Sequence, residues 1–207
     1  MANVQHNVLS STDIHEPKGV DTAAANKVYV PDGAGSGAWK TITTMGWENY
    51  DDTATTGTPI PLTLADTDYI MTNDTLGPVT NTGSMLPNNT TMWNASTNRF
   101  DFTSLNINDY VNIRIDLNVN TGGNNHELLM KMNFAVGGSS PFSLNIQQQN
   151  IKTITNTSIV RYVSFFIGST DIKDNPASLT MRSSNTGDTV VVNGWLIRTS
   201  PLNPVYT

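Results

Sequence analysis

The residues of this chain whose types could do chemistry form no known catalytic pattern. The chain has no Cys and three His, namely His6, His15 and His126. A chain without Cys has no thiol nucleophile, no disulfide and no Cys-ligated zinc site. The His are too scattered to predict a metal site, and no Gly-x-Ser-x-Gly turn occurs. His6 and His15 could contact a partner or respond to pH, whereas His126, beside a loop, is expected to be solvated.

Carboxylates are plentiful, but their spacing predicts no site. Asp51 with Asp52, or Asp66 with Asp68, could hold calcium through oxygen ligands, although the EF-hand spacing is absent. Glycosidases need two carboxyl groups at a defined separation, and nothing in the sequence brings together any two of Asp101, Asp109, Asp116 and Glu127. Solvated turns and strand faces explain these residues better. We therefore expect no enzymatic activity, no cofactor and no metal.

A glycine-rich run near the N-terminus fits a nucleotide-binding pattern only in its spacing. Gly33, Gly35 and Ala38 match G-x-G-x-x-A just after the strand-like residues Lys27–Val30. Dinucleotide binding requires a helix that begins at this point and meets the pyrophosphate. The residues that follow, Trp39–Thr44, are rich in β-branched types. The run therefore predicts a turn between two strands.

Composition excludes further classes of function. Charged residues make up 14% of the 207 residues, the formal net charge is −6 and the pI is about 4.8. An acidic surface repels phosphate, so we expect no sequence-independent binding of nucleic acid. No apolar run is long enough to cross a bilayer as a helix. The first residues show neither a basic region nor an apolar core, so we expect no secretory signal, and synthesis and folding in a cytosol.

The positional pattern from about Ile60 onward is that of consecutive strands. The clearest is Tyr110–Asn120, where five apolar residues alternate with polar ones over a period of two. A hairpin loop and a return strand follow, and further strands are predicted around Phe142–Ile146, Ile159–Ile167, Leu179–Met181 and Val190–Ile197. Many short strands separated by turns predict an all-β fold, a jelly-roll β-sandwich.

Two late segments, 159–167 and 190–197, are apolar on both faces. Strands of this kind are covered on both sides. The second cover could be another subunit, or these could be central strands under a long loop of the same chain.

Trp93 is expected to close the core of the sandwich, with sugar stacking as the alternative. Trp39, Trp47 and Tyr50 are expected to pack the N-terminal segment onto the body or onto a partner.

Composition and periodicity divide the chain into three parts. Residues 1–45 are predicted to be an extended N-terminal docking arm with a small β element, because they show little periodicity. Residues 46–60 are predicted to be a linker, and residues 61–207 the jelly-roll domain.

Two stretches resemble known families. Ser11–Val20, Asn26–Val30 and Asp32–Lys40 resemble a module near the N-termini of structural proteins of tailed bacteriophages. Trp93–Phe100, which leads into the strand from Tyr110, is similar to the entry pattern of C1q/TNF-like jelly rolls. The ending, residues 187–197, is similar to the last two strands of that fold. The usual Pro-Gly before the long strand is replaced here by Leu105–Asp109.

The resemblance implies a virion structural protein that forms homotrimers. It would be a decoration protein on the capsid exterior, at the virion surface, bound to the major capsid protein or another virion protein. The particle-docking residues are expected to be His15, Pro17, Lys18, Gly19, Tyr29, Gly33, Gly35, Gly37 and Trp39. The trimer interface is expected to include Tyr162, Phe166 and Trp195. The alternatives are a tail-fibre or receptor-binding module that recognises host surface glycan, and a carbohydrate-active enzyme of the tail.

Overall fold

The structure, a computed structural model, describes residues 27–32, 34, 37–43, 45–84, 91–202 and 205–206. It divides into two compact units. Residues 1–43 and 204–207 form unit 1, and residues 44–203 form unit 2. The described part of unit 1 is a small antiparallel sheet with strand order β1–β2–β15, composed of β1 (Lys27–Pro31), β2 (Gly37–Thr43) and β15 (Val205–Tyr206).

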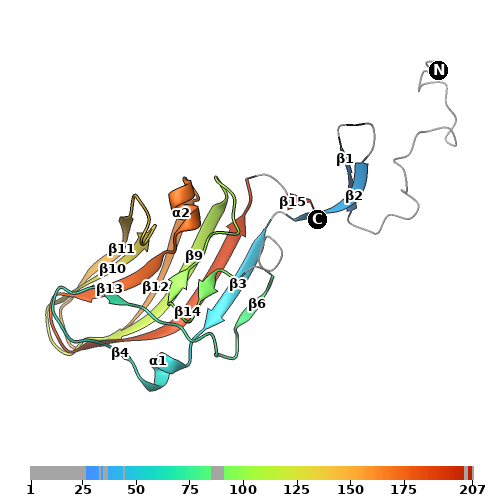
Figure 1. The fold of residues 1–207 in the computed structure, drawn as a ribbon. Coiled ribbons are helices and arrows are strands. Elements are labelled where there is room, and N and C mark those ends of the chain that lie inside the picture. Colours follow the sequence, from blue (N-terminus) through green and yellow to red (C-terminus); the bar gives the residue numbers. More distant parts are fainter. Residues whose placement is uncertain are drawn as a thin grey trace, which may run out of the picture. The chain divides into compact units, whose positions relative to one another are not determined.

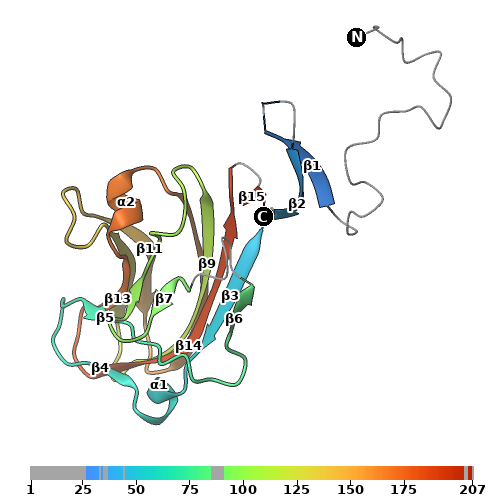
Figure 2. The same cartoon turned by 45° about the vertical axis from the view of Figure 1, so that its right-hand side comes forward.

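Unit 2 is a β-sandwich of two antiparallel sheets (Figures 1 and 2). The larger sheet has the order β12–β9–β14–β3–β6, with β4 also paired to β14. Its strands are β3 (Gly46–Asp51), β4 (Ile60–Leu62), β6 (Asn81–Ser84), β9 (Tyr110–Asn120), β12 (Asn156–Phe166) and β14 (Asp188–Ser200). The smaller sheet has the order β11–β10–β13–β5, formed by β5 (Tyr69–Ile70), β10 (His126–Phe134), β11 (Phe142–Ile151) and β13 (Ser178–Ser183).

The connectivity is that of a jelly roll. The hairpin β10–β11 lies in one sheet, while the strands that precede and follow it, β9 and β12, pair with each other in the opposite sheet. In the same way, β13 pairs with β10, and β14 pairs with β9. This nested pairing confirms the predicted fold class. A short hairpin of β7 (Trp93–Asn94) and β8 (Arg99–Phe100) and two short helices, α1 (Ala54–Gly57) and α2 (Thr170–Asp174), complete unit 2.

The core lies between the two sheets. The predicted apolar face of Tyr110–Asn120 is confirmed, because its alternate side chains from Val111 to Val119 are fully buried. They face a core that also holds Met130, Met132 and Phe134 of β10. Trp93 is buried, and its ring centroid lies 4.8 Å from that of Phe100 and 5.3 Å from that of Trp195. Trp93 therefore closes the core, as expected, and offers no surface for sugar stacking.

The prediction of a linker over residues 46–60 is wrong for much of that segment. Residues 46–51 form β3, which pairs with β14 along six positions, and Tyr50 is buried in the core. The segment was misread because its apolar residues are few, although Trp47 and Tyr50 lie on opposite faces of one strand. Unit 2 also ends at Asn203 rather than at residue 207, since β15 pairs with β2 of unit 1.

Candidate association surfaces

The outer face of the larger sheet carries an aromatic strip. We define the outer-face strip as Met45, Trp47, Tyr110, Tyr162, Phe166 and Leu196. Tyr162 and Phe166 of β12 are 62% and 60% exposed, Met45 is 62% exposed and Trp47 is 39% exposed. Large exposed apolar side chains gathered on one face indicate an interaction surface.

Strand register brings the members of the strip together. Phe166 lies opposite Tyr110 on β9, with ring centroids 5.4 Å apart. Tyr162 lies opposite Arg114, which in turn lies opposite Leu196 on β14. Further along β3 and β14 on the same face, Trp47 pairs with Arg198. Residues from β3, β9, β12 and β14, distant in sequence, therefore lie on one face in three adjacent cross-strand rows, and the middle row also contains Ser164, Asn112 and Arg198.

The strip borders a polar region on the same face. The Arg114 guanidinium lies 2.8 Å from a carboxylate oxygen of Asp116, and the Asn193 amide donates to the other oxygen of Asp116 at 2.8 Å. Asn112 donates to the Ser164 hydroxyl at 2.6 Å. These side chains are paired with one another within the face, and Asn112 and Ser164 lie between the Phe166–Tyr110 pair and Tyr162.

The three residues expected at the trimer interface do not share one location. Tyr162 and Phe166 are exposed on the outer-face strip, but Trp195 is 1% exposed and packs in the core beside Trp93 and Phe100. The Trp195 side chain is thus not available to a second copy in the folded chain. The neighbouring residue Leu196 points outward instead, because successive residues of a strand face opposite sides of a sheet.

Strict alternation along β14 predicts the opposite orientation for Trp195, because it is three residues beyond the buried Val192. Val190 and Val192 are fully buried and Val191 is not, while Ile197 is buried and Leu196 only partly so. The pairing with β9 shifts between Val192 and Gly194, so Trp195 rejoins the inward set after a β-bulge. β14 is a central strand, and its inward face accounts for most of its apolar residues.

Unit 1 brings together three of the expected docking residues. Tyr29 and Trp39 lie opposite each other on β1 and β2, with ring centroids 5.5 Å apart in an edge-to-face arrangement. A Cβ atom on Gly37 would lie 2.4 Å from the Val30 carbonyl oxygen and 2.8 Å from the Tyr29 ring. Only glycine therefore allows Tyr29 to pack over this end of β2. His15, Pro17, Lys18, Gly19, Gly33 and Gly35 lie outside the described residues.

The glycine-rich run leads into a strand. β2 begins at Gly37 and continues to Thr43. This confirms the predicted turn between two strands, and the helix that dinucleotide binding would need does not follow.

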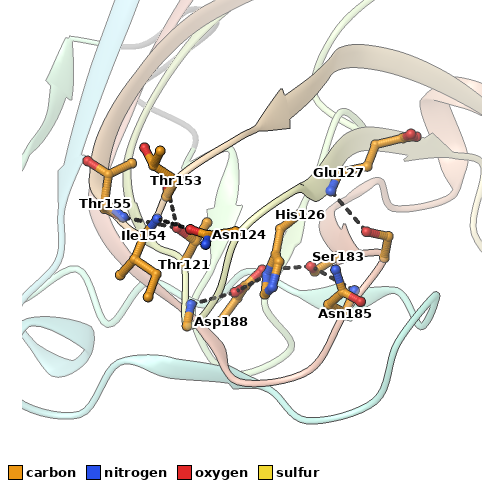
Figure 3. A network of polar contacts seen from close by, with 12 residues as sticks. Thr121, Asn124, His126, Glu127, Thr153, Ile154, Thr155, Ser183, Asn185 and Asp188 are labelled. Atoms are coloured by element: carbon orange, nitrogen blue, oxygen red, sulfur yellow. Dashed lines mark hydrogen bonds and ion pairs between the residues drawn. The ribbon is translucent and has the colours of Figure 1, made fainter.

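His126 is not solvated, and that prediction is wrong. It is 5% exposed, and its Nδ1 lies 2.6 Å from Oδ1 of the fully buried Asp188. The same carboxylate accepts the backbone N–H of Gly122 at 2.8 Å and the Ser183 hydroxyl at 2.6 Å (Figure 3). This network ties the β9–β10 loop to the two strands β13 and β14.

The order of the groups in this network differs from that of a hydrolase triad. Nucleophilic catalysis requires the His between the Ser and the Asp, so that the imidazole can take the hydroxyl proton. Here Asp188 lies between His126 and Ser183, and all three are buried. The arrangement stabilises loops and offers no exposed nucleophile.

A second buried acid lies on β3. The Glu48 side chain is fully buried, accepts a hydrogen bond from the Tyr50 hydroxyl and accepts the Met92 N–H at 3.1 Å. Desolvation raises the pKa of Glu48, although these two hydrogen bonds act in the opposite direction. Desolvation and the neighbouring Glu48 carboxyl also raise the pKa of Tyr50. Both side chains face the core and stand away from the outer-face strip.

The candidate calcium carboxylates bind local backbone and hydroxyl groups. Asp52 accepts the Asp74 N–H at 2.7 Å and the Thr55 hydroxyl at 2.6 Å. Burial acts to raise the pKa of Asp74, but hydrogen bonds from Leu76 and Thr53 outweigh it and lower the pKa to about 2. Asp68 pairs with Lys131 at 2.6 Å. Within the described ranges, no three His or acidic side chains are grouped as metal ligands.

None of the helices in the described part of the chain has the length and apolar character needed to span a membrane.

No family model and no curated protein matches this chain. Among solved structures, the chain is similar to the CBM22-1–GH10 modules of Clostridium thermocellum endo-1,4-β-D-xylanase 10B, complexed with xylohexaose. That likeness has a TM-score of 0.35 and 14% identity, and it covers 78% of this chain and 30% of the xylanase chain. The chain thus matches under a third of that protein's length.

The chain is also similar to the PRD1 vertex protein P5, with a TM-score of 0.33 and 16% identity over 78% of this chain and 99% of that chain. Neither likeness is close enough to transfer a function.

Proposed function

We propose that this chain is a non-enzymatic structural protein of a tailed-bacteriophage virion. It forms a homotrimer through the outer-face strip and docks on the capsid exterior through unit 1. The observation that carries the proposal is the strip itself, where Tyr162 and Phe166 are about 60% exposed on a well-packed sandwich. The sequence of the N-terminal residues, which resembles a phage structural module, supports the virion context.

Self-association explains the strip better than solvent exposure does. Aromatic side chains dominate the energy of interfaces when they become buried at their centre. The strip contains no carboxylate, and the nearby Asp116 is already paired with Arg114. Two copies that each carry a formal charge of −6 can meet at such a face without bringing acidic groups together.

Unit 1 fits a docking role because it is a separate compact unit with its own aromatic pair. The mechanism is binding alone, since the trimer stabilises the particle by associating only with the assembled lattice. β15 makes the C-terminal residues part of this unit. Removal of residues 1–43 alone would therefore leave β15 without its partner, and docking is better tested with single substitutions.

Association is tested by sedimentation of the full chain. The wild type is expected to sediment at three times the 22.5-kDa protomer mass. Replacing Tyr162 and Phe166 together by Ser should weaken association by at least about tenfold, since each anchor is worth more than ~1 kcal/mol. The control is Phe142→Ser, which removes an aromatic residue of 46% exposure from the other sheet. A double variant that remains as associated as the control would contradict the proposed interface.

Docking is tested on purified particles by the number of copies of this chain relative to the major capsid protein. Hundreds of copies support a decoration protein, and a few dozen indicate a tail or vertex appendage. Absence from particles would contradict the virion role. Trp39→Ala should lower the copy number while trimers persist, because the Tyr29–Trp39 pair lies in unit 1.

A further inference from the structure

A pocket of about 240 Å³ lies beside the β7–β8 hairpin and the end of α2. The residues with polar side chains in its lining are Asn94, Thr97, Arg99, Asp101, Thr103 and Asp174. None of these residues belongs to the outer-face strip, so association through that strip does not use them. One amide, two hydroxyls, two carboxylates and a guanidinium therefore line a pocket outside the proposed association surface.

The walls of the pocket are held in place by hydrogen bonds. The Asn94 carboxamide oxygen accepts the N–H groups of Ser96 and Thr97 at 3.0 and 3.2 Å, which closes the β7–β8 turn. Asp101 accepts the N–H and the hydroxyl of Thr103 at 2.9 and 2.7 Å.

The hairpin is also attached to the sandwich. Phe100 and Ala177 exchange two backbone hydrogen bonds of 2.8 and 2.9 Å, and Phe100 itself is fully buried. Groups that are ordered before a ligand arrives lose little freedom on binding, which favours affinity.

Arg99 supplies hydrogen-bond donors that no other group of the described residues occupies. Across the hairpin it lies opposite Asn94, and within the described residues its guanidinium makes no hydrogen bond or ion pair. Arg114, by comparison, is paired with Asp116. A guanidinium carries five N–H donors. The carboxylates of Asp101 and Asp174 line the same pocket; one Asp101 oxygen accepts both hydrogen bonds from Thr103, and one Asp174 oxygen lies 3.3 Å from the Lys173 ammonium, which leaves one oxygen of each carboxylate as an acceptor.

We propose that this pocket binds a single uncharged sugar ring. Sugar hydroxyls both donate and accept, which matches a lining that mixes a guanidinium with two carboxylates, two hydroxyls and an amide. Arg99 is the one cation among the lining residues, and Lys173 pairs with Asp174, so the two carboxylates balance both cations and the pocket has no excess of positive charge to favour phosphate or sulfate. Its volume lies just below the roughly 300 Å³ at which pockets for drug-sized ligands begin, which suits one ring. The inference goes beyond the assembly role and does not depend on it.

The test uses the full-length protein and free monosaccharides. Glucose, galactose, mannose and N-acetylglucosamine are offered separately at millimolar concentration, and binding is measured by saturation-transfer NMR. Glucuronate and inorganic phosphate serve as anionic probes. We expect at least one neutral sugar to bind with a millimolar dissociation constant, and Arg99→Ala to weaken that binding at least tenfold. The matched control is Arg182→Ala, which removes an arginine of β13 that does not line the pocket.

Each outcome decides the proposal. Loss of binding in Arg99→Ala with retention in Arg182→Ala supports it, provided both variants keep the wild-type thermal midpoint. If Arg99→Ala loses that midpoint, Asp174→Ala, which alters an exposed residue of the same pocket, replaces it as the decisive variant. No binding of any neutral sugar, equal binding in all variants, or tighter binding of glucuronate or phosphate would overturn it. Copy number on particles does not enter this test, so its failure leaves the assembly role unaffected.

Discussion

Replacing Asp188 by alanine removes the acceptor at the centre of the network in Figure 3. The carboxylate is fully buried and accepts three hydrogen bonds, from Gly122, His126 and Ser183. The Asp188→Ala substitution would leave these donors without a partner in a place that water does not reach. The loop between β9 and β10 would also lose its attachment to β14.

The size of the expected loss in unfolding free energy follows from comparing the buried Asp188 with an exposed aspartate. Removing one partner from a buried, hydrogen-bonded charge costs about 3–5 kcal/mol, because the remaining groups stay desolvated and unpaired. Asp68 pairs with Lys131 at 2.6 Å, the same distance as the Asp188–His126 contact, but the Asp68 side chain is 38% exposed. An exposed ion pair contributes about 0–1 kcal/mol. Asp188→Ala is therefore expected to destabilise unit 2 by at least ~2 kcal/mol more than Asp68→Ala.

The assay is equilibrium urea unfolding of wild type, Asp188→Ala and Asp68→Ala at one protomer concentration, because association also contributes to apparent stability. With a slope of about 1–3 kcal/mol per molar urea, the Asp188 variant should lose more than ~1 M in its midpoint. If the two variants unfold within about 1 kcal/mol of each other, the network does not stabilise the fold as argued.

Three further predictions concern Glu48, Gly37 and Asp74. Burial raises the pKa of Glu48, so the stability that its neutral form contributes is fully present below the unfolded-state pKa of 4.5 and is lost as pH rises through the folded-state pKa. Glu48→Gln, which stays neutral, should therefore remove this fall in thermal midpoint with rising pH. A pH profile unchanged by the substitution would contradict the prediction. Gly37→Ala should displace the Tyr29 ring and lower the copy number of the chain on particles. The control Gly57→Ala, where an added Cβ meets nothing within 4 Å, should leave the copy number unchanged. Equal copy numbers for both variants would show that docking does not depend on the packing of Tyr29 against Gly37. Hydrogen bonds lower the pKa of Asp74 to about 2, so its contribution to stability is present above the unfolded-state pKa of 3.8 and is lost as pH falls toward 2. Asp74→Asn should lack this acid-dependent loss of stability. Identical acid-unfolding transitions in the variant and the wild type would argue against the prediction.

Local patterns were sufficient for the fold class of unit 2 and for its strands from β9 onward. The alternation of Tyr110–Asn120 determines which side chains enter the core, since a strand has a period of two. The bounds of β9 agree with the expectation, and the later strands appear where alternation or a continuous apolar run predicts them. The turn after β1 and the absence of a nucleotide-binding helix at Gly37 were equally local properties.

Positions that depend on distant partners could not be read in this way. His126 resembles a loop residue until Asp188, 62 residues away, supplies a buried carboxylate. Trp195 looked suited to an interface, but a β-bulge just before it sets its direction, and the bulge is visible only in the pairing with β9. The partner of β2 comes from the opposite end of the chain, which no periodicity near residue 40 contains.

The sequence by itself thus determined the class of fold, the inward face of the long strand and the lack of a catalytic pattern, because each follows from residue type and near-neighbour spacing. Only the tertiary structure decided which aromatic side chains are exposed together and which acids are buried. These properties arise from strand register: Phe166 meets Tyr110, and Trp47 meets Arg198, only when β12, β9, β14 and β3 lie side by side. The outer-face strip exists for the same reason.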